Sequence, residues 1–225
     1  MKYLIPVAIA ALFVLQACNN DKTSKNEATA DKDTITNTTT ATDHSKMDDM
    51  NMSNDLMNAM KPSMEKAEVM KMTGDFDYDF ANMMIHHHQA AIDMSQVELS
   101  KGSDAQVKGW AQKIIDAQKA EITQFQKFTS SNKPAEMKHE GGEQHSEMHE
   151  IHEKTAKDMN SMTMTGNVDK NFVMMMKLHH EAAVEMAKNE LSHGKNYDMK
   201  KMAQKIIEDQ NKEIKEFNDW LSKNK

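Results

Sequence analysis

Residues 80–94 read FANMMIHHHQAAIDM, and residues 172–186 read FVMMMKLHHEAAVEM. Phenylalanine, paired methionines, paired histidines, alanine and a last methionine therefore recur at the same spacing, 92 residues apart. Steps of three and four residues place these side chains on one face of an α-helix. The pattern indicates an internal duplication of a helical segment that carries Met and His.

The duplication extends without a gap from Met72 towards the C-terminus. Met72-Thr73-Gly74 returns as Met164-Thr165-Gly166, and AQKII at residues 111–115 returns at residues 203–207. A repeat of this length is one supersecondary unit that buries its apolar face against its neighbour.

Each copy reads as two helices joined by a short turn. Gly102 and Gly194 suit the C-terminal caps of the first helices. The pattern predicts helices over residues 75–101, 104–128, 167–193 and 196–221. Because short turns force antiparallel neighbours, hairpins at residues 72–128 and 164–225 predict an all-α antiparallel four-helix bundle.

Residues 1–17 are typical of a lipoprotein signal peptide. The apolar run that ends at Leu15 is too short to span a bilayer comfortably, and Leu15-Gln16-Ala17-Cys18 fits the box cleaved before a lipidated cysteine. We expect an extracytoplasmic protein of the cell envelope, facing the periplasm or the cell surface and anchored to a membrane by lipid on Cys18. The alternative is an ordinary secreted protein in which this cysteine is incidental.

The composition narrows the function classes. The formal net charge is −7, with 28 Lys+Arg that are all lysine, so no basic patch predicts binding to nucleic acid. A single cysteine excludes a disulfide within the chain, and 7 Gly with 3 Pro favour helices over a turn-rich β architecture. No nucleophile triad, phosphate-binding glycine loop or cysteine-based metal motif predicts an enzyme.

Two polar segments surround the first hairpin. Residues 18–71 read as a flexible, methionine-rich tether, with a short helix possible over residues 54–71, and residues 129–163 read as a solvated linker. Both hold side chains that can bind metal independently of the bundle, namely His44, Met47, Met50, Met52, His139, His145, His149 and His152.

The core-facing stripe of the first helix carries polar donors. On a helical wheel Met84 and His88 share its centre, His87 lies beside them and Met94 at the edge, whereas His86 points nearly opposite. The candidate metal ligands are therefore Met84, His87, His88, Met94, Met176, His179, His180 and Met186.

The second helix places a glutamine and a glutamate on its apolar face. Gln118 and Glu121, repeated as Gln210 and Glu213, either orient the histidines of the facing helix or complete the ligand set. The alternative is that these side chains extend to solvent at the edge of the bundle.

The donor types point to copper. Thioethers suit Cu(I) and Ag(I), while imidazole suits copper in both oxidation states as well as zinc and nickel. Packing explains a single core methionine, but it does not explain Met47, Met50 and Met52 in a segment without an apolar face.

The run from Asp77 to Met94, with Gln118-x-x-Glu121 on the next helix, resembles the bacterial family catalogued as domain of unknown function 305. The resemblance covers both copies, from about Met72 to the C-terminus. It implies a ferritin-like helical bundle that is exported, and some members are tied to copper binding and copper tolerance. The tether and the histidine-rich linker depart from the family pattern.

Three functions follow as hypotheses. The first is a non-enzymatic lipoprotein that buffers, sequesters or hands on Cu(I) to or from a copper-exporting or copper-accepting protein. The second is a ferritin-like di-iron oxidase or peroxidase, for which only Glu190-x-x-His193 fits the Glu-x-x-His motif on a bundle helix. The third is an interaction module without metal, whose histidines pack against Gln118 and Glu121.

Overall fold

The computed structural model describes residues 44–134 and 142–225, with side chains from residues 55 and 147 onward. Within these ranges all regular structure is helical: α1 (His44–Glu68), α2 (Phe76–Lys101), α3 (Ala105–Ser131), α4 (Gly142–Ser161), α5 (Val168–His193) and α6 (Tyr197–Lys223). The all-α prediction is confirmed. In the described part of the chain, no helix has the length and apolar character needed to cross a bilayer. The signal peptide predicted at residues 1–17 and Cys18 lie outside the described residues.

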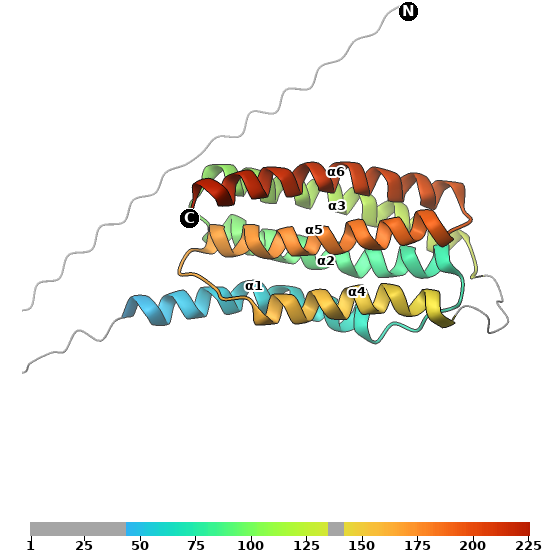
Figure 1. Cartoon of the computed structure of the whole chain (residues 1–225), viewed down its shortest axis with the longest axis horizontal. Helices are drawn as coiled ribbons and strands as arrows, with labels where there is room; N and C mark the ends of the chain where they lie inside the picture. The colour runs from blue at the N-terminus through green and yellow to red at the C-terminus, as the bar shows by residue number, and fades with distance from the viewer. Residues whose placement is uncertain (1–43, 135–141) are drawn as a thin grey trace, which may run out of the picture. The chain divides into compact units, whose positions relative to one another are not determined.

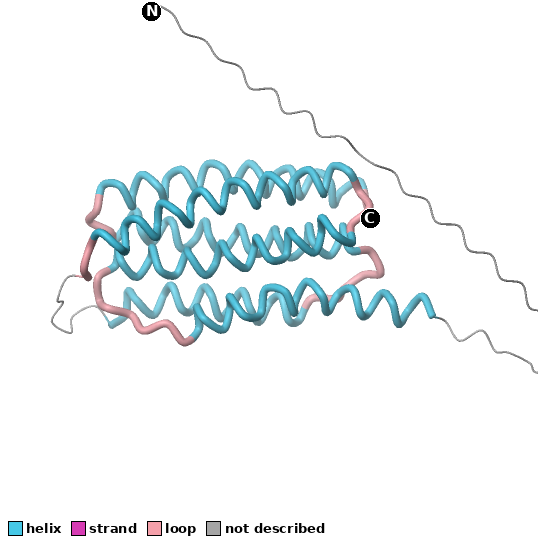
Figure 2. The backbone as a smooth tube through the Cα atoms, turned by 180° about the vertical axis from the view of Figure 1, so that it is seen from behind, coloured by secondary structure: helices cyan, strands magenta, loops and turns pink. Residues whose placement is uncertain are grey.

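The six helices form three layers of two (Figure 1). Helices α2 and α5 lie side by side in the middle layer, with α3 and α6 on one face and α1 and α4 on the other, as the rear view also shows (Figure 2). Helix α2 packs against α1, α3 and α5, and α5 packs against α2, α4 and α6. The two predicted hairpins are present, and their first helices are covered on both sides.

The structure differs from the tether and the linker expected at residues 18–71 and 129–163. Helix α1 occupies the end of the first segment and α4 the middle of the second. Leu56 and Met60 are buried in α1, and the residues 92 positions later, Met148 and His152, are buried in α4. The repeat is therefore a three-helix unit, because the second face of α2 and α5 is also apolar and needs a cover.

Side-chain caps fix the starts of α2, α3, α5 and α6. The Asp104 carboxylate accepts hydrogen bonds from the N–H groups of Gln106 and Val107 at 2.8 and 3.1 Å, which satisfies donors that lack a partner within the helix. The other caps are Asp75, Asn167 and Asn196. Each cap lies at, or next to, the helix start predicted from sequence.

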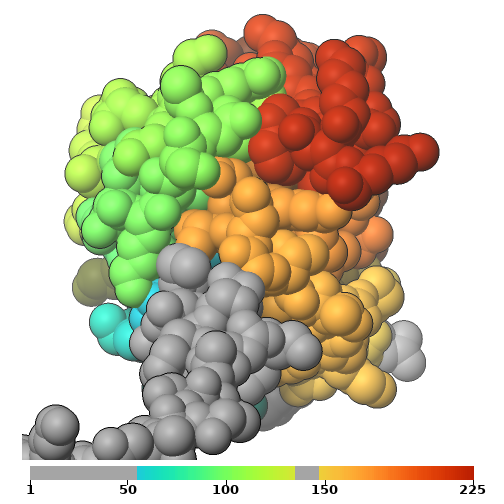
Figure 3. All heavy atoms as spheres, turned by 90° about the vertical axis from the view of Figure 1, so that its left-hand side faces the viewer, coloured from blue at the N-terminus to red at the C-terminus, as the bar shows by residue number. Residues whose placement is uncertain are grey.

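Each repeat also holds a turn of the other repeat. The Asp169 carboxylate, at the start of α5, accepts the N–H groups of Ser103 and Asp104 and the Ser103 hydroxyl, each at 2.8 Å. Figure 3 shows the start of α5 in orange against the turn between α2 and α3 in green. Asp77 does the same for the turn between α5 and α6, where it accepts the Asn196 N–H at 2.8 Å. These contacts fix α2 and α5 in register.

Candidate metal centre

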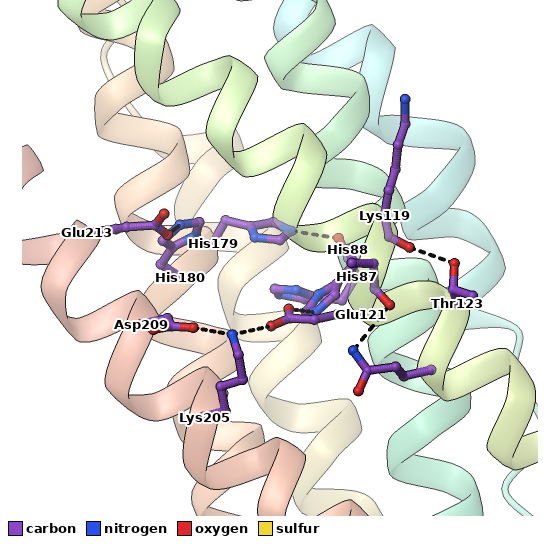
Figure 4. A network of polar contacts seen from close by, with 12 residues as sticks. His87, His88, Lys119, Glu121, Thr123, His179, His180, Lys205, Asp209 and Glu213 are labelled. Atoms are coloured by element: carbon purple, nitrogen blue, oxygen red, sulfur yellow. Dashed lines mark hydrogen bonds and ion pairs between the residues drawn. The ribbon is translucent and has the colours of Figure 1, made fainter.

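Histidine pairs lie where the two middle-layer helices meet. The ring centroids of His87 and His179 are 3.6 Å apart, at an interplanar angle of 36°. Nε2 of His179 lies 2.9 Å from the backbone oxygen of His87, and a carbonyl can only accept, so this nitrogen donates (Figure 4). His179 therefore carries its lone pair on Nδ1.

This inner pair has buried nitrogens without a protein partner. Both ring nitrogens of His87, and Nδ1 of His179, are buried and accept or donate no hydrogen bond among the described residues. Burial and the neighbouring His179 hold the pKa of His87 well below its ordinary value, and burial and His180 do the same to the pKa of His179. Both rings are therefore neutral near pH 7, and each presents a lone pair in a dry interior.

The outer pair faces the second helices of the repeats. Nε2 of His88 donates to Oε2 of Glu121 at 2.9 Å, and Nε2 of His180 donates to Oε2 of Glu213 at 2.8 Å. Nδ1 of each ring is buried without a partner in the described chain. A carboxylate that holds Nε2–H fixes the tautomer that leaves Nδ1 free to bind a metal ion.

Glu121 is itself held ionised. Burial acts to raise its pKa, but the hydrogen bond and charge of His88, together with Lys205, lower the pKa overall. The Lys205 ammonium of α6 lies 3.6 Å from Oε1 of Glu121 and also pairs with Asp209 (Figure 4). The carboxylate therefore links α2, α3 and α6 at the histidine.

The inner pair borders a small cavity of about 10 Å³, near the lower limit for one water molecule. Its lining joins α1, α2, α4 and α5 and is rich in imidazole and thioether groups: Met60, Met64, His86, His87, Ala90, His152, Thr155, Met159 and His179. We call this cavity the inner chamber. Its donors suit a soft ion such as Cu(I) or Ag(I), and the unpartnered nitrogens of the inner pair would find a partner in it.

Sequence reasoning missed several residues of the chamber. His86 lies on its wall although the wheel places it opposite Met84, because α2 is covered on two faces. Met60, Met64 and Met159 were also missed. The available signal was the 92-residue register, which pairs Met60 with His152 and extends the repeat upstream of Met72.

The predicted methionine ligands lie in apolar clusters beside the histidines. Met84 and Met186 share one cluster with Phe80 and Phe125, and Met94 shares the other with Met176. All four are fully buried. Each cluster therefore holds one predicted methionine ligand from each repeat, among other methionines.

The candidate ligands of the tether and linker are described only in part. His149 is half-buried and His152 is buried on α4. His139 and the side chains of His44, Met47, Met50, Met52 and His145 lie outside the described residues. Within the described ranges, no three His, Cys, Asp or Glu side chains group closely enough to hold a metal ion.

Comparison with solved structures finds metal-bound forms of the protein CopM and one further DUF305 protein. CopM in its Cu(II)-bound form is 29% identical over 69% of this chain and 100% of CopM, with a TM-score of 0.52. CopM in its Cu(I)-bound form is 27% identical over 65% of this chain and 96% of CopM, with a TM-score of 0.49. A DUF305 protein from Streptomyces coelicolor is 20% identical over 68% of this chain and 94% of its own, with a TM-score of 0.53, and shows the fold alone.

No curated protein matches the sequence significantly. The sequence profile of DUF305, a domain of unknown function, matches twice in tandem, at residues 14–129 and 127–221. The two matches agree with the internal duplication of the sequence at a spacing of 92 residues. Since together they span most of its length, the chain belongs to the DUF305 family.

Proposed function

We propose that this protein binds Cu(I) between its two repeats and sequesters, buffers or hands on the ion outside the cytoplasm. The observation that carries the proposal is the His87–His179 pair, with ring centroids 3.6 Å apart and three buried nitrogens that have no partner among the described residues. Two neutral imidazoles so placed are costly in an apolar interior unless an ion or a donor satisfies them.

Donor chemistry supports copper in its reduced state. The inner chamber adds three thioethers to the imidazoles, and thioethers favour Cu(I) and Ag(I) over zinc and nickel. CopM in its Cu(II)-bound form, which is 29% identical over 69% of this chain and the whole length of CopM, supports copper as the metal, and the thioethers favour the reduced ion. Thioethers also survive an oxidising compartment, where two thiols would form a disulfide.

The proposal assigns His87 and His179 as the central ligands. His88 and His180, oriented by Glu121 and Glu213, are the outer ligands. Gln118 and Gln210 line the same pocket between α3 and α6 as these two glutamates. The sequence-predicted donors that flank the pairs within the apolar clusters are Met84, Met94, Met176 and Met186.

The proposed location is the cell envelope. Residues 1–17 have the form of a signal peptide, and Cys18 is the residue that a lipid anchor would use. We propose a lipid-anchored, non-enzymatic protein that exchanges copper with an exporter or acceptor.

The test is an anaerobic Cu(I) titration against a chromogenic chelator, with Cys18→Ser in every sample so that no thiol competes. One variant replaces His87, His88, His179 and His180 by alanine, and a matched control replaces His139, His145, His149 and His193. Binding lost in the first variant alone supports the proposal. Binding lost only in the control assigns the chemistry to histidines outside the two pairs, and no competitive binding by the parent protein rejects copper.

A further inference from the structure

Helices α1 and α4 supply five of the nine residues that line the inner chamber. Met60 and Met64 come from α1, and His152 and Met159 come from α4. Met60 and Met159 are 1% exposed, and His152 is 5% exposed. Four side chains with metal-binding atoms thus face His87 and His179 from helices outside the repeated segments at residues 80–94 and 172–186.

The two repeats contribute different donors to this one place. In the 92-residue register Met60 corresponds to His152, Met64 to Ala156, and Ala67 to Met159. Helix α1 therefore provides two thioethers, and α4 provides one thioether and one imidazole. A layer needed only to cover α2 and α5 would be satisfied by aliphatic side chains at these positions.

A surface groove of about 680 Å³ runs between α1 and α4 above the chamber. Met64 and His152 line both the groove and the chamber, so these two side chains separate them. The rest of the groove is mostly polar and carries both charges, from Lys61, Glu65, Glu68, Glu153 and Lys157. The groove therefore extends from solvent to Met64 and His152, on whose other side the inner chamber lies.

We infer that α1 and α4 complete the metal site, with Met60, Met64 and Met159 as ligands and His152 at its mouth, and that the groove between these helices is the path by which the ion reaches it. The inference rests on the proposed function and names the donors and the route of the same site. Met64 and His152 act first on an arriving ion, since they border the groove. Thioethers on both sides make the chamber selective for Cu(I) and Ag(I).

The ligand test uses thioether removal at constant volume. Met60, Met64 and Met159 are replaced together by leucine, which conserves packing volume. The matched control replaces Met83, Met175 and Met199, which are also buried but lie outside the chamber. We expect Cu(I) and Ag(I) affinities to fall at least tenfold in the chamber variant and to change less than twofold in the control.

The outcomes separate this inference from the proposed function. A chamber variant that binds as the parent does, while the four-histidine variant does not, overturns the inference and leaves the proposed function standing. Equal losses in the chamber and control variants show a packing effect and also overturn it. Absence of binding by the parent protein rejects the proposed function first.

The route is tested by blocking the groove. Ala156 lines the groove but not the chamber, and Ala156→Trp fills the groove beside His152. Stopped-flow loading with Ag(I) should slow at least fivefold, with the equilibrium affinity unchanged. Ala120→Trp on the exposed face of α3 is the control and should load at the parent rate. Equal loading rates in both tryptophan variants contradict the route.

Discussion

The carboxyl group of Glu98 on α2 faces the carboxylate of Asp169 on α5, in the protein interior. Glu98 is fully buried, and neither of its oxygens receives an N–H or O–H donor among the described residues. Two carboxyl groups can share a hydrogen bond only if one of them holds a proton. Burial and Asp169 raise the pKa of Glu98 to about 8, so Glu98 holds it. Burial and Asp77 likewise raise the pKa of Glu190 to about 9.

These pairs predict that stability falls at alkaline pH. The folded-state pKa values lie above the ordinary value of 4.5, so the folded protein binds more protons than the unfolded chain between about pH 5 and pH 8 to 9. Below about pH 6.5 the buried His87 and His179 act in the opposite direction, because their lowered pKa values mean that the unfolded chain binds more protons there. The free energy of unfolding should therefore be highest near pH 7 and fall between about pH 7 and pH 8 to 9, by about 1.4 kcal/mol per pH unit for each shared proton.

Urea unfolding at about pH 7, 7.5 and 8 measures this slope, above the range in which the histidines titrate. In a Glu98→Gln, Glu190→Gln variant the amide replaces the O–H donor, so most of the slope should disappear. Lys108 and Asp104 near Glu98, and Lys200 and Asp75 near Glu190, remain unchanged in the variant. Identical slopes for parent and variant would refute the shared proton.

The turn after α2 predicts a cost for adding one methyl group. A Cβ at Gly102 would lie 1.9 Å from Oε1 of Glu98 and 2.7 Å from its backbone oxygen, which cannot both move away. Gly102→Ala should lower the free energy of unfolding by about 1–3 kcal/mol. Gly109→Ala is the control, because nothing lies within 4 Å of its Cβ in mid-α3, and it should stabilise by about 1 kcal/mol. Equal effects of the two substitutions would contradict the close approach.

Helix starts and the partners of the outer histidines follow from sequence, and the reasons are local. Asp104 before a periodic segment is a cap whatever surrounds it. The face that holds Glu121 on α3 needs only helical geometry to meet His88. The glycine at position 102 was also expected, as a C-terminal cap. Its φ is −65°, and the requirement is space for Glu98, which only tertiary structure reveals.

The layer formed by α1 and α4 could not be predicted from the sequence in the same way. Helix α1 buries Leu56 and Met60 among lysine, glutamate and asparagine, and so thin a stripe resembles a polar tether. A helical wheel also assumes one buried face, whereas α2 has two. That assumption removed His86 from consideration, although it lines the inner chamber.

The hydrogen bond between Glu121 and His88 predicts that a residue without contact to the metal ion affects the metal affinity. Glu121→Gln keeps the shape but removes the charge that fixes the His88 tautomer, so Cu(I) affinity should fall about 10- to 100-fold. Chelator competition measures the change. Asp116→Asn, exposed on the same helix, removes the same charge and should leave the affinity unchanged. Equal affinities in the two variants would mean that Glu121 stabilises the fold only.

Metal binding should also slow hydrogen exchange more in one outer layer, α1 with α4, than in the other, α3 with α6. An ion in the inner chamber joins α1 and α4 to α2 and α5, whereas an ion at the outer pair joins α3 and α6 to them. At a free metal concentration one hundred times Kd, binding stabilises the folded state by about 2.7 kcal/mol, which slows exchange through global unfolding about 100-fold. Amides that exchange by local opening, without global unfolding, are slowed most in the layer that holds the ion, so they show where the ion binds. Hydrogen exchange with and without Cu(I) should therefore show the largest added protection in α1 and α4. Protection that increases mainly in α3 and α6 would place the ion at His88 and His180, and the chamber would then be a packing feature.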